Sequence, residues 1–119
     1  PNRIAAAKLN KRIIDSLIKL DATAKIISMG DFNDDPINDS FKKVLQTQGK
    51  LKKIEEINLF NPMEKLHKKG VGSLAYRDKW NLFDQIYFTS NFLSEKKERY
   101  SFWKVGVYNP SYLVDPSKR

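Results

Sequence analysis

The apolar and polar positions divide the chain into one long amphipathic helix and several short apolar runs. Between Arg3 and Leu20, apolar residues recur at intervals of three and four with lysines, arginine and aspartate between them, which predicts an amphipathic helix. The run Lys25 to Met29 has the length of a strand covered on both faces. Helix, tight loop, strand and acidic loop in this order predict a layered α/β unit. The apolar positions of the predicted helix are Ile4, Leu9, Ile13, Ile14, Leu17, Ile18 and Leu20.

Proline and glycine mark the helices that follow. Pro36 prevents a helix from running through the acidic loop, and a helix with Phe41, Val44 and Leu45 buried is predicted to end near Gly49. A second short helix is predicted to end before Gly70. The candidate caps of the first of these helices are Asn38, Asp39 and Ser40.

The remaining apolar runs alternate in the manner of strands. Residues 73–77 and 82–89 are rich in aromatic and β-branched side chains, and we expect them to form a hairpin across Asp78 and Lys79. Residues 102–108 alternate as a further strand before Asn109 and Pro110. These runs predict a sheet beside the helices.

Composition limits the class of protein. The chain has 119 residues and 40% hydrophobic content, enough for the core of one domain, and it has no run of about 18 apolar residues that would predict a membrane span. Cysteine is absent, which excludes a disulfide framework and a thiolate metal site. A net charge of +8 favours nucleic acid, phosphorylated headgroups or a membrane surface as partner, or simply gives a soluble, self-repelling surface.

The acidic loop contains candidate catalytic residues. Gly30 lets the backbone turn, so Asp31 lies at the carboxyl end of a predicted strand, and alternation directs Phe32 inward and returns Asn33 to the side of Asp31. A carboxylate there can take a proton from water or bind a divalent metal, and the amide can donate to phosphoryl oxygens. The alternatives are a turn cluster that bonds backbone amides, and a calcium loop that would lack its central Gly and terminal Glu.

A second acid lies in a later apolar run. Asp84 interrupts residues 82–88, and an acid in such a run is costly to bury unless it is hydrogen-bonded or takes part in chemistry. Its alternative role is a buried acid satisfied by backbone amides. We therefore predict that Asp31 and Asp84 share one site at neighbouring strand ends.

Two motifs in this order resemble those of a known superfamily. Met29 to Pro36 contains the Gly-Asp-Phe-Asn motif of the endonuclease/exonuclease/phosphatase superfamily, and Phe83 to Ser90 is similar to its later Asp-His-Ile or Asp-Gln-Ile strand. Arg3 to Ala7 also resembles the start of the helix that precedes the first motif. Gln85 replaces the commoner His. The resemblance implies an α/β fold, part of a four-layer α/β/β/α sandwich like that of deoxyribonuclease I.

The resemblance also implies roles for the candidate residues. Asp31 would orient or deprotonate the attacking water and contact Mg²⁺ or Mn²⁺, Asn33 would contact the scissile phosphate, and Asp84 would orient a catalytic imidazole. The family's other metal ligands, an Asn and a Glu, and its Ser-Asp-His motif have no counterpart here, so the main metal ligands are expected outside this chain. His67, between basic residues, is predicted to be an ordinary solvated side chain.

We therefore expect residues 1–119 to be a partial catalytic domain of a metal-dependent phosphoester hydrolase. Such a part would be inactive alone and would pair with the missing half of its own domain or with a second copy. The alternative is a noncatalytic basic module that binds nucleic acid or anionic lipid. The substrate, possibly nucleic acid or a phospholipid headgroup, is not specified by the fold.

Overall fold

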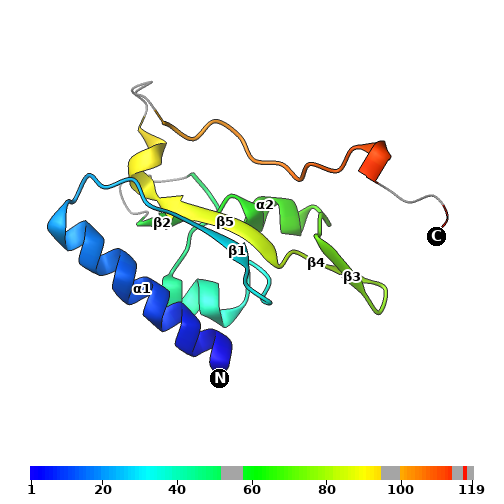
Figure 1. Ribbon diagram of the computed structural model, residues 1–119, viewed down its shortest axis with the longest axis horizontal. Coiled ribbons are helices and arrows are strands. Elements are labelled where there is room, and N and C mark those ends of the chain that lie inside the picture. The colour runs from blue at the N-terminus through cyan, green and yellow to red at the C-terminus, as the bar shows by residue number, and fades with distance from the viewer. Residues whose placement is uncertain (52–57, 95–99, 114–116, 118–119) are drawn as a thin grey trace.

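The computed structural model describes residues 1–51, 58–94, 100–113 and 117. Figure 1 shows one long helix beside a small sheet, with a short hairpin projecting at one end. The helices and strands, in chain order, are α1 (Asn2–Leu20), β1 (Ile27–Asp31), the π-helical turn η1 (Ser40–Leu45), β2 (Leu59–Phe60), α2 (Met63–Lys68), β3 (Leu74–Tyr76), β4 (Lys79–Asn81) and β5 (Asp84–Thr89). Two 3₁₀ turns follow, at Ser90–Leu93 and Ser111–Leu113.

The main sheet has three strands in the order β1-β5-β2, and both pairings are antiparallel. In the β1–β5 ladder Ile27 pairs with Phe88, and the register continues to Asp31 opposite Asp84. The β3–β4 hairpin forms a separate sheet of two strands. The predicted α/β class is confirmed, with an antiparallel sheet and helices.

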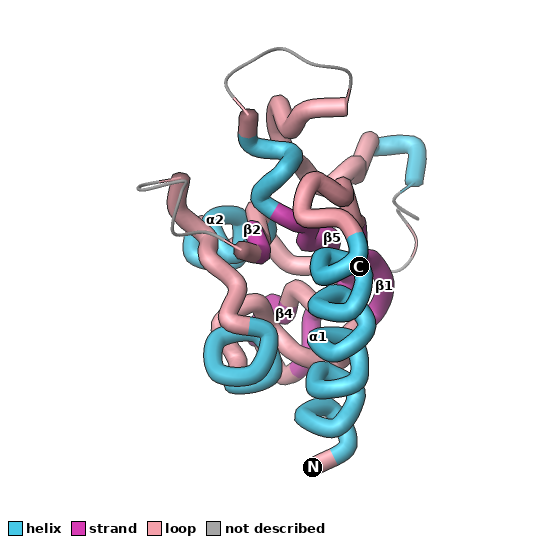
Figure 2. Tube along the Cα trace, turned by 90° about the vertical axis from the view of Figure 1, so that its left-hand side faces the viewer, coloured by secondary structure: helices cyan, strands magenta, loops and turns pink. Residues whose placement is uncertain are grey.

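One face of the sheet is covered by helices. α1 and η1 lie side by side along it in Figure 2. Side chains from both pack on Tyr87 of β5, whose ring meets those of Phe32 and Phe41 edge-on or tilted, at centroid distances of 5.7 and 5.8 Å. The buried members of this core are Ala7, Ile14, Phe41, Leu45, Leu59 and Tyr87.

The opposite face of the sheet is largely open. At one end Phe60 and Phe88 pack with Leu93, Phe92 and Phe102. Toward the other end Ile27, Met29 and Ile86 are exposed, Met29 to 66%. The prediction that the first strand is covered on both faces is therefore wrong for the described residues, because helices cover β1 on one side only.

The helices agree with their predictions with some differences in detail. α1 and α2 form where the apolar spacing and Gly70 predicted them. The helix after Pro36 is a single turn that ends at Leu45, not near Gly49, because Gln46 adopts a left-handed conformation with φ of 56°. On α1 only Ala7 and Ile14 are buried, while three predicted core positions are about half exposed: Leu9, Ile13 and Leu17.

Two strand predictions need correction. Residues 73–77 do not pair with 82–89: the hairpin closes on the separate strand Lys79–Asn81, and β5 joins the main sheet. The turn falls at Arg77 and Asp78, both with positive φ, as a two-residue hairpin loop requires. Residues 102–108 form no strand, because only Phe102 of this alternating run is packed in a core cluster, while Trp103 is 81% exposed.

The described helices include none with both the length and the apolar character needed to cross a bilayer.

Candidate active site

Asp31 and Asp84 stand opposite each other where the β1–β5 ladder ends. Asp31 is the last residue of β1, Asp84 is the first of β5, and the register pairs them directly. Partners in an antiparallel ladder have Cα atoms about 4.5–5.5 Å apart and side chains on the same face. Both residues are exposed. Gly30, with φ of +151°, supplies a conformation that L side chains rarely adopt immediately before Asp31.

The loop after Asp31 is held against the same strand end. The Phe32 N–H donates to the Phe83 carbonyl at 2.9 Å, which extends the ladder by one bond. Asn33 has φ of 52°, and its N–H donates to Asp31 Oδ1 at 2.9 Å. Asp31 therefore bonds a backbone amide, as the turn-cluster alternative requires. It also lies at the exposed end of the β1–β5 ladder.

Asn33 is exposed and lies next to Asp31 in the chain fold. Both residues line a hollow of about 310 Å³ whose other walls come from α1 and η1. Within the described part of the chain, no hydrogen bond or ion pair engages the Asp84 carboxylate. Asp31 thus pairs with Asp84 across the ladder and lies beside Asn33 in the loop, so all three predicted residues are found at one end of the sheet, although only Asp31 and Asn33 line this hollow.

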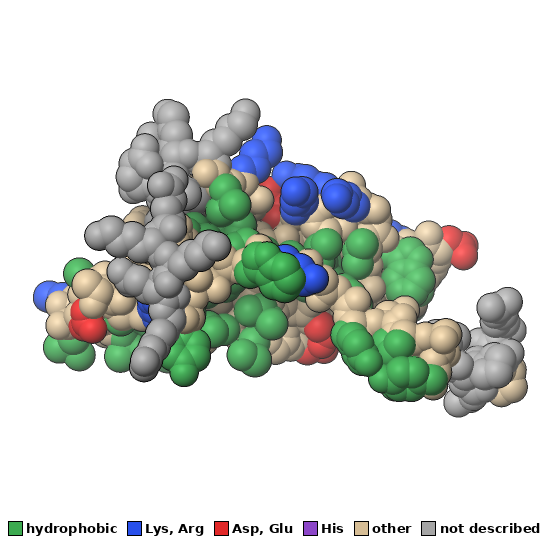
Figure 3. All heavy atoms as spheres, turned by 90° about the horizontal axis from the view of Figure 1, so that it is seen from above, with side chains coloured by type: hydrophobic (Ala, Val, Ile, Leu, Met, Phe, Trp, Pro, Cys, Tyr) green, Lys and Arg blue, Asp and Glu red, His purple; other side chains and the backbone are tan. Residues whose placement is uncertain are grey.

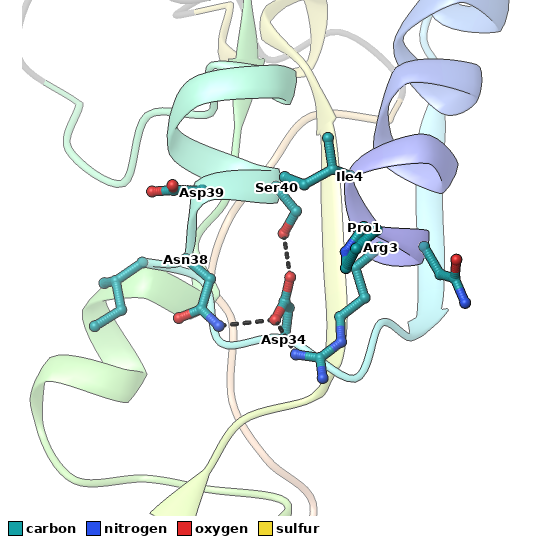
Figure 4. A pocket seen from close by; sticks show the side chains of 9 residues that line it. Pro1, Arg3, Ile4, Asp34, Asn38, Asp39 and Ser40 are labelled. Carbon is teal, nitrogen blue, oxygen red and sulfur yellow. Dashed lines mark hydrogen bonds and ion pairs between the residues drawn. The ribbon is translucent and has the colours of Figure 1, made fainter.

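Asp34 points inward and ties the acidic loop to α1. Its carboxylate accepts hydrogen bonds from Arg3 at 2.6 Å, Asn38 at 2.8 Å and Ser40 at 2.6 Å (Figure 4). Burial by itself raises the pKa of Asp34, but these hydrogen bonds and the Arg3 charge outweigh it and hold the pKa below its ordinary value of 3.8. Asp34 therefore has a structural role, and it borders a hollow of about 830 Å³ beside the start of α1.

Asp35 also points inward, and it corrects the prediction for His67. Asp35 Oδ1 accepts the Leu82 N–H at 2.7 Å, and His67 Nε2 lies 3.5 Å from the same oxygen. The His67 side chain is only 14% exposed, so it is not an ordinary solvated histidine. It packs against the loop because α2 follows β2 directly and returns beside β5.

Gln85 and Asn61 form a buried polar link that sequence reasoning missed. Gln85 Nε2 donates to the Asp34 carbonyl at 2.6 Å, and Gln85 Oε1 accepts from Asn61 Nδ2 at 2.9 Å. Asn61 Oδ1 in turn accepts the Met63 N–H at 3.0 Å. Both side chains are almost fully buried. The position of Gln85 inside an alternating strand was the signal that could have revealed this link, because a buried side-chain amide needs a partner for its oxygen and another for its nitrogen.

The donors at the strand end suit a hard divalent cation without enclosing one. Among the described residues, no three His, Asp or Glu side chains converge as a set that could hold a metal ion. Asp31 and Asp84 offer carboxylate oxygens, which Mg²⁺ takes one or two at a time together with water and phosphate. The pair therefore offers the type of ligand that such an ion prefers, but two carboxylates alone do not complete its coordination.

These features define the class: a mixed α/β domain with a pair of carboxylates at the end of an antiparallel ladder. A family model described as the endonuclease/exonuclease/phosphatase family matches residues 1–119. The chain belongs to this family, a group of phosphoesterase-type proteins that generally depend on a divalent metal. Neither the curated proteins nor the solved structures gave a match to the chain.

The lowered pKa of Asp34 predicts that the protein loses stability in acid. A carboxylate whose pKa is depressed by folding stabilises the protein above its ordinary pKa, and this contribution is lost as pH falls below about 4. Asp34→Asn should cost about 1–3 kcal/mol at pH 7 and make the decline in acid shallower. Urea unfolding between pH 2.5 and 7 measures both. Asp39→Asn, an exposed neighbour, is the control, and equal acid slopes for the Asp34 variant and the parent would contradict the assignment.

Gln85→Leu tests the buried link. The substitution leaves the Asp34 carbonyl and the Asn61 amide without partners, and each unpaired buried group costs about 1–3 kcal/mol. We expect a loss of about 2–4 kcal/mol in urea unfolding and faster amide exchange at residues 31–34. Gln48→Leu, at an exposed position, should change neither quantity. Unchanged exchange in the Gln85 variant would show that the link does not hold the loop.

Proposed function

We propose that this chain carries the acidic side of a metal-dependent phosphoester hydrolase site. The observation that carries the proposal is the register that sets Asp31 opposite Asp84 in a chain matched over its whole length by a phosphoesterase family model. Like charges placed directly opposite on a ladder destabilise it unless something compensates them. A bound cation or a protonated imidazole at this point supplies such compensation, which supports a catalytic role for the pair.

Each residue has a part that its position favours. Asp31 has one carboxylate oxygen engaged by the Asn33 N–H, and its other oxygen would either hold the metal or orient and deprotonate the attacking water. The exposed Asn33 amide donates to a phosphoryl oxygen. Asp84, which the described chain leaves unengaged, orients a histidine supplied from outside this chain. His67 is not that histidine, since it lies against Asp35.

A divalent ion, when bound, would supply Lewis-acid stabilisation of phosphoryl charge. Mg²⁺ or Mn²⁺ suits the carboxylate of Asp31, and the main ligands are proposed to lie outside this chain. The 119 residues alone are accordingly proposed to bind the ion weakly and to lack turnover. The family match does not favour the alternative of a noncatalytic basic module.

The proposal predicts that neutralising either acid removes activity without removing stability. In the longest natural protein that contains this chain, Asp31→Asn and Asp84→Asn should each lower kcat/KM for a generic phosphodiester with Mg²⁺ by about 10²–10⁴-fold. Their free energies of unfolding should stay within about 0.5 kcal/mol of the parent or rise, because both residues are exposed and repel each other.

Asp15→Asn, an exposed acid on α1, is the matched control and should keep full activity. Broadening of the amide signals of residues 31 and 84 by Mn²⁺ in the 119-residue chain gives a second readout that does not depend on turnover. A longer protein that binds polyanions but shows no metal-dependent hydrolysis would refute the proposal, as would full activity in both variants.

We also propose that the open sheet face is covered by a second layer of the same domain. Ile27, Met29 and Ile86 form an exposed apolar strip that ends at the acid pair. Burying apolar surface of this kind is favourable by about 25 cal/mol per Å². A covering layer would also bring its own side chains to Asp31 and Asp84, which is the reason for preferring it to a second copy of the chain.

Methyl NMR with a soluble paramagnetic agent tests this layer. The methyl signals of Met29 and Ile86 should be strongly attenuated in the 119-residue chain and protected in the longer protein. Those of Leu20, which is 85% exposed on α1, serve as the control and should be attenuated in the chain. Protection already present in the short chain and lost on dilution would instead identify a homodimer. Equal attenuation of Met29 in both proteins would exclude a covering layer.

A further inference from the structure

The β3–β4 hairpin projects beyond the sheet at the end where Asp84 begins β5 (Figure 1). Its base is fixed to that strand end, because Ser73 Oγ accepts the N–H groups of both Phe83 and Asp84 at 3.2 Å. Its apex is the two-residue turn Arg77-Asp78, with φ of 48° and 58°. A ligand held at the acid pair would therefore have this hairpin beside it.

Two aromatic rings on the hairpin are exposed although each is supported on one side. The Arg77 guanidinium lies 5.1 Å from the centroid of the Tyr76 ring, which remains 59% exposed. Trp80 packs on Gly72, where an added Cβ would come within 2.8 Å of Trp80 Cβ and 3.0 Å of Cε3, and Trp80 remains 56% exposed. A ring fixed by the protein on one side and open on the other is a platform on which a flat group can stack.

Cations outnumber acids on the hairpin and in the helix before it. Arg77 and Lys79 belong to the hairpin and flank one acid, Asp78, while exposed Lys65 and Lys69 lie on and after α2, the helix that precedes it; Figure 3 shows Lys and Arg side chains gathered over this part of the molecule. Cations interleaved with stacking rings complement a ligand that combines phosphates with flat bases.

The distribution of the rings disfavours insertion into a lipid surface. Trp80 pairs with Ala75 and Tyr76 pairs with Lys79, so the two rings lie on opposite faces of the ribbon. The apex between them carries Arg77 and Asp78 and offers no apolar tip. An element that penetrates a membrane interface needs its apolar groups on one side. The hairpin instead presents two separate stacking surfaces with cations beside them.

We propose that the β3–β4 hairpin recognises single-stranded nucleic acid, with bases stacked on Trp80 and Tyr76 and backbone phosphates contacted by Arg77 and Lys79. The conclusion that the substrate of the enzyme is a nucleic acid rests on the proposed hydrolase function. Binding of nucleic acid by the hairpin does not, because it requires neither a metal ion nor turnover.

The chain contains two tryptophans, both exposed, and Trp103 lies outside the hairpin with Lys104 Nζ 4.2 Å from its ring centroid. Comparing the two therefore separates a contribution of the hairpin from that of any exposed ring beside a cation. In the Trp103→Phe variant, titration with an unlabelled thymidine 20-mer in EDTA should quench the fluorescence of Trp80. By anisotropy of the labelled 20-mer, Trp80→Ala and Tyr76→Ala should each weaken binding about 5- to 150-fold. Trp103→Ala should leave it unchanged, and Trp80→Phe should retain most of it.

Salt dependence tests the cations separately. Arg77→Ala and Lys79→Ala should each lower the slope of log affinity against log salt by about one. Preference for phosphatidylserine vesicles over the 20-mer, or equal losses for Trp80→Ala and Trp103→Ala, would overturn the inference. Hairpin-dependent binding in a longer protein without hydrolase activity supports it while refuting the proposed function. Hydrolysis of phosphodiesters that lack bases, without binding that depends on the hairpin, would support the proposed function and refute this inference.

Discussion

The antiparallel pairing of β1 with β5 is the contact on which the candidate site depends, because it joins two segments far apart in the chain and fixes which side chains face each other. A slip of one residue would send the side chain of Asp84 to the helix-covered face and leave Asp31 without its partner. Two features on that face oppose the slip: Tyr87 is enclosed by Phe32 and Phe41, and Gln85 bonds the Asp34 carbonyl. The buried side of the sheet thus determines the geometry of its exposed side.

The acidic loop separates its carboxylates by function through the turn that follows β1, where Asn33 adopts a φ of 52°. Asp34 and Asp35 face inward, where donors from α1, η1 and Leu82, just before β5, satisfy them, and their role is to anchor the loop. Asp31 remains at the rim with one oxygen engaged by a backbone amide. Of the two inner acids, only Asp35 bonds a backbone amide, that of Leu82, as the turn-cluster alternative requires, whereas Asp34 bonds side chains. The rim position is what leaves Asp31 free for the proposed chemistry.

Sequence reasoning succeeded where the determining contacts are local. The spacing of Ile14 and its neighbours predicts α1, and alternation through Gly30 correctly directs Phe32 inward and Asp31 outward. It failed where distant partners decide. The burial of His67 depends on Asp35 across the fold, and the alternating run at 102–108 lacks a neighbouring strand among the described residues. The hairpin was misassigned because its turn residues, Arg77 and Asp78, are not the usual glycine or asparagine.

The position of the acid pair at the edge of an apolar strip has an electrostatic consequence. In open solvent, water screens both carboxylates and weakens any interaction with a cation or an imidazole. A layer packed on Ile27, Met29 and Ile86 would lower the local dielectric beside the pair, which raises the repulsion between the two charges and equally strengthens their attraction for a cation. In this proposal the apolar face and the acids are coupled, because covering the face would turn two exposed carboxylates into a stronger cation site.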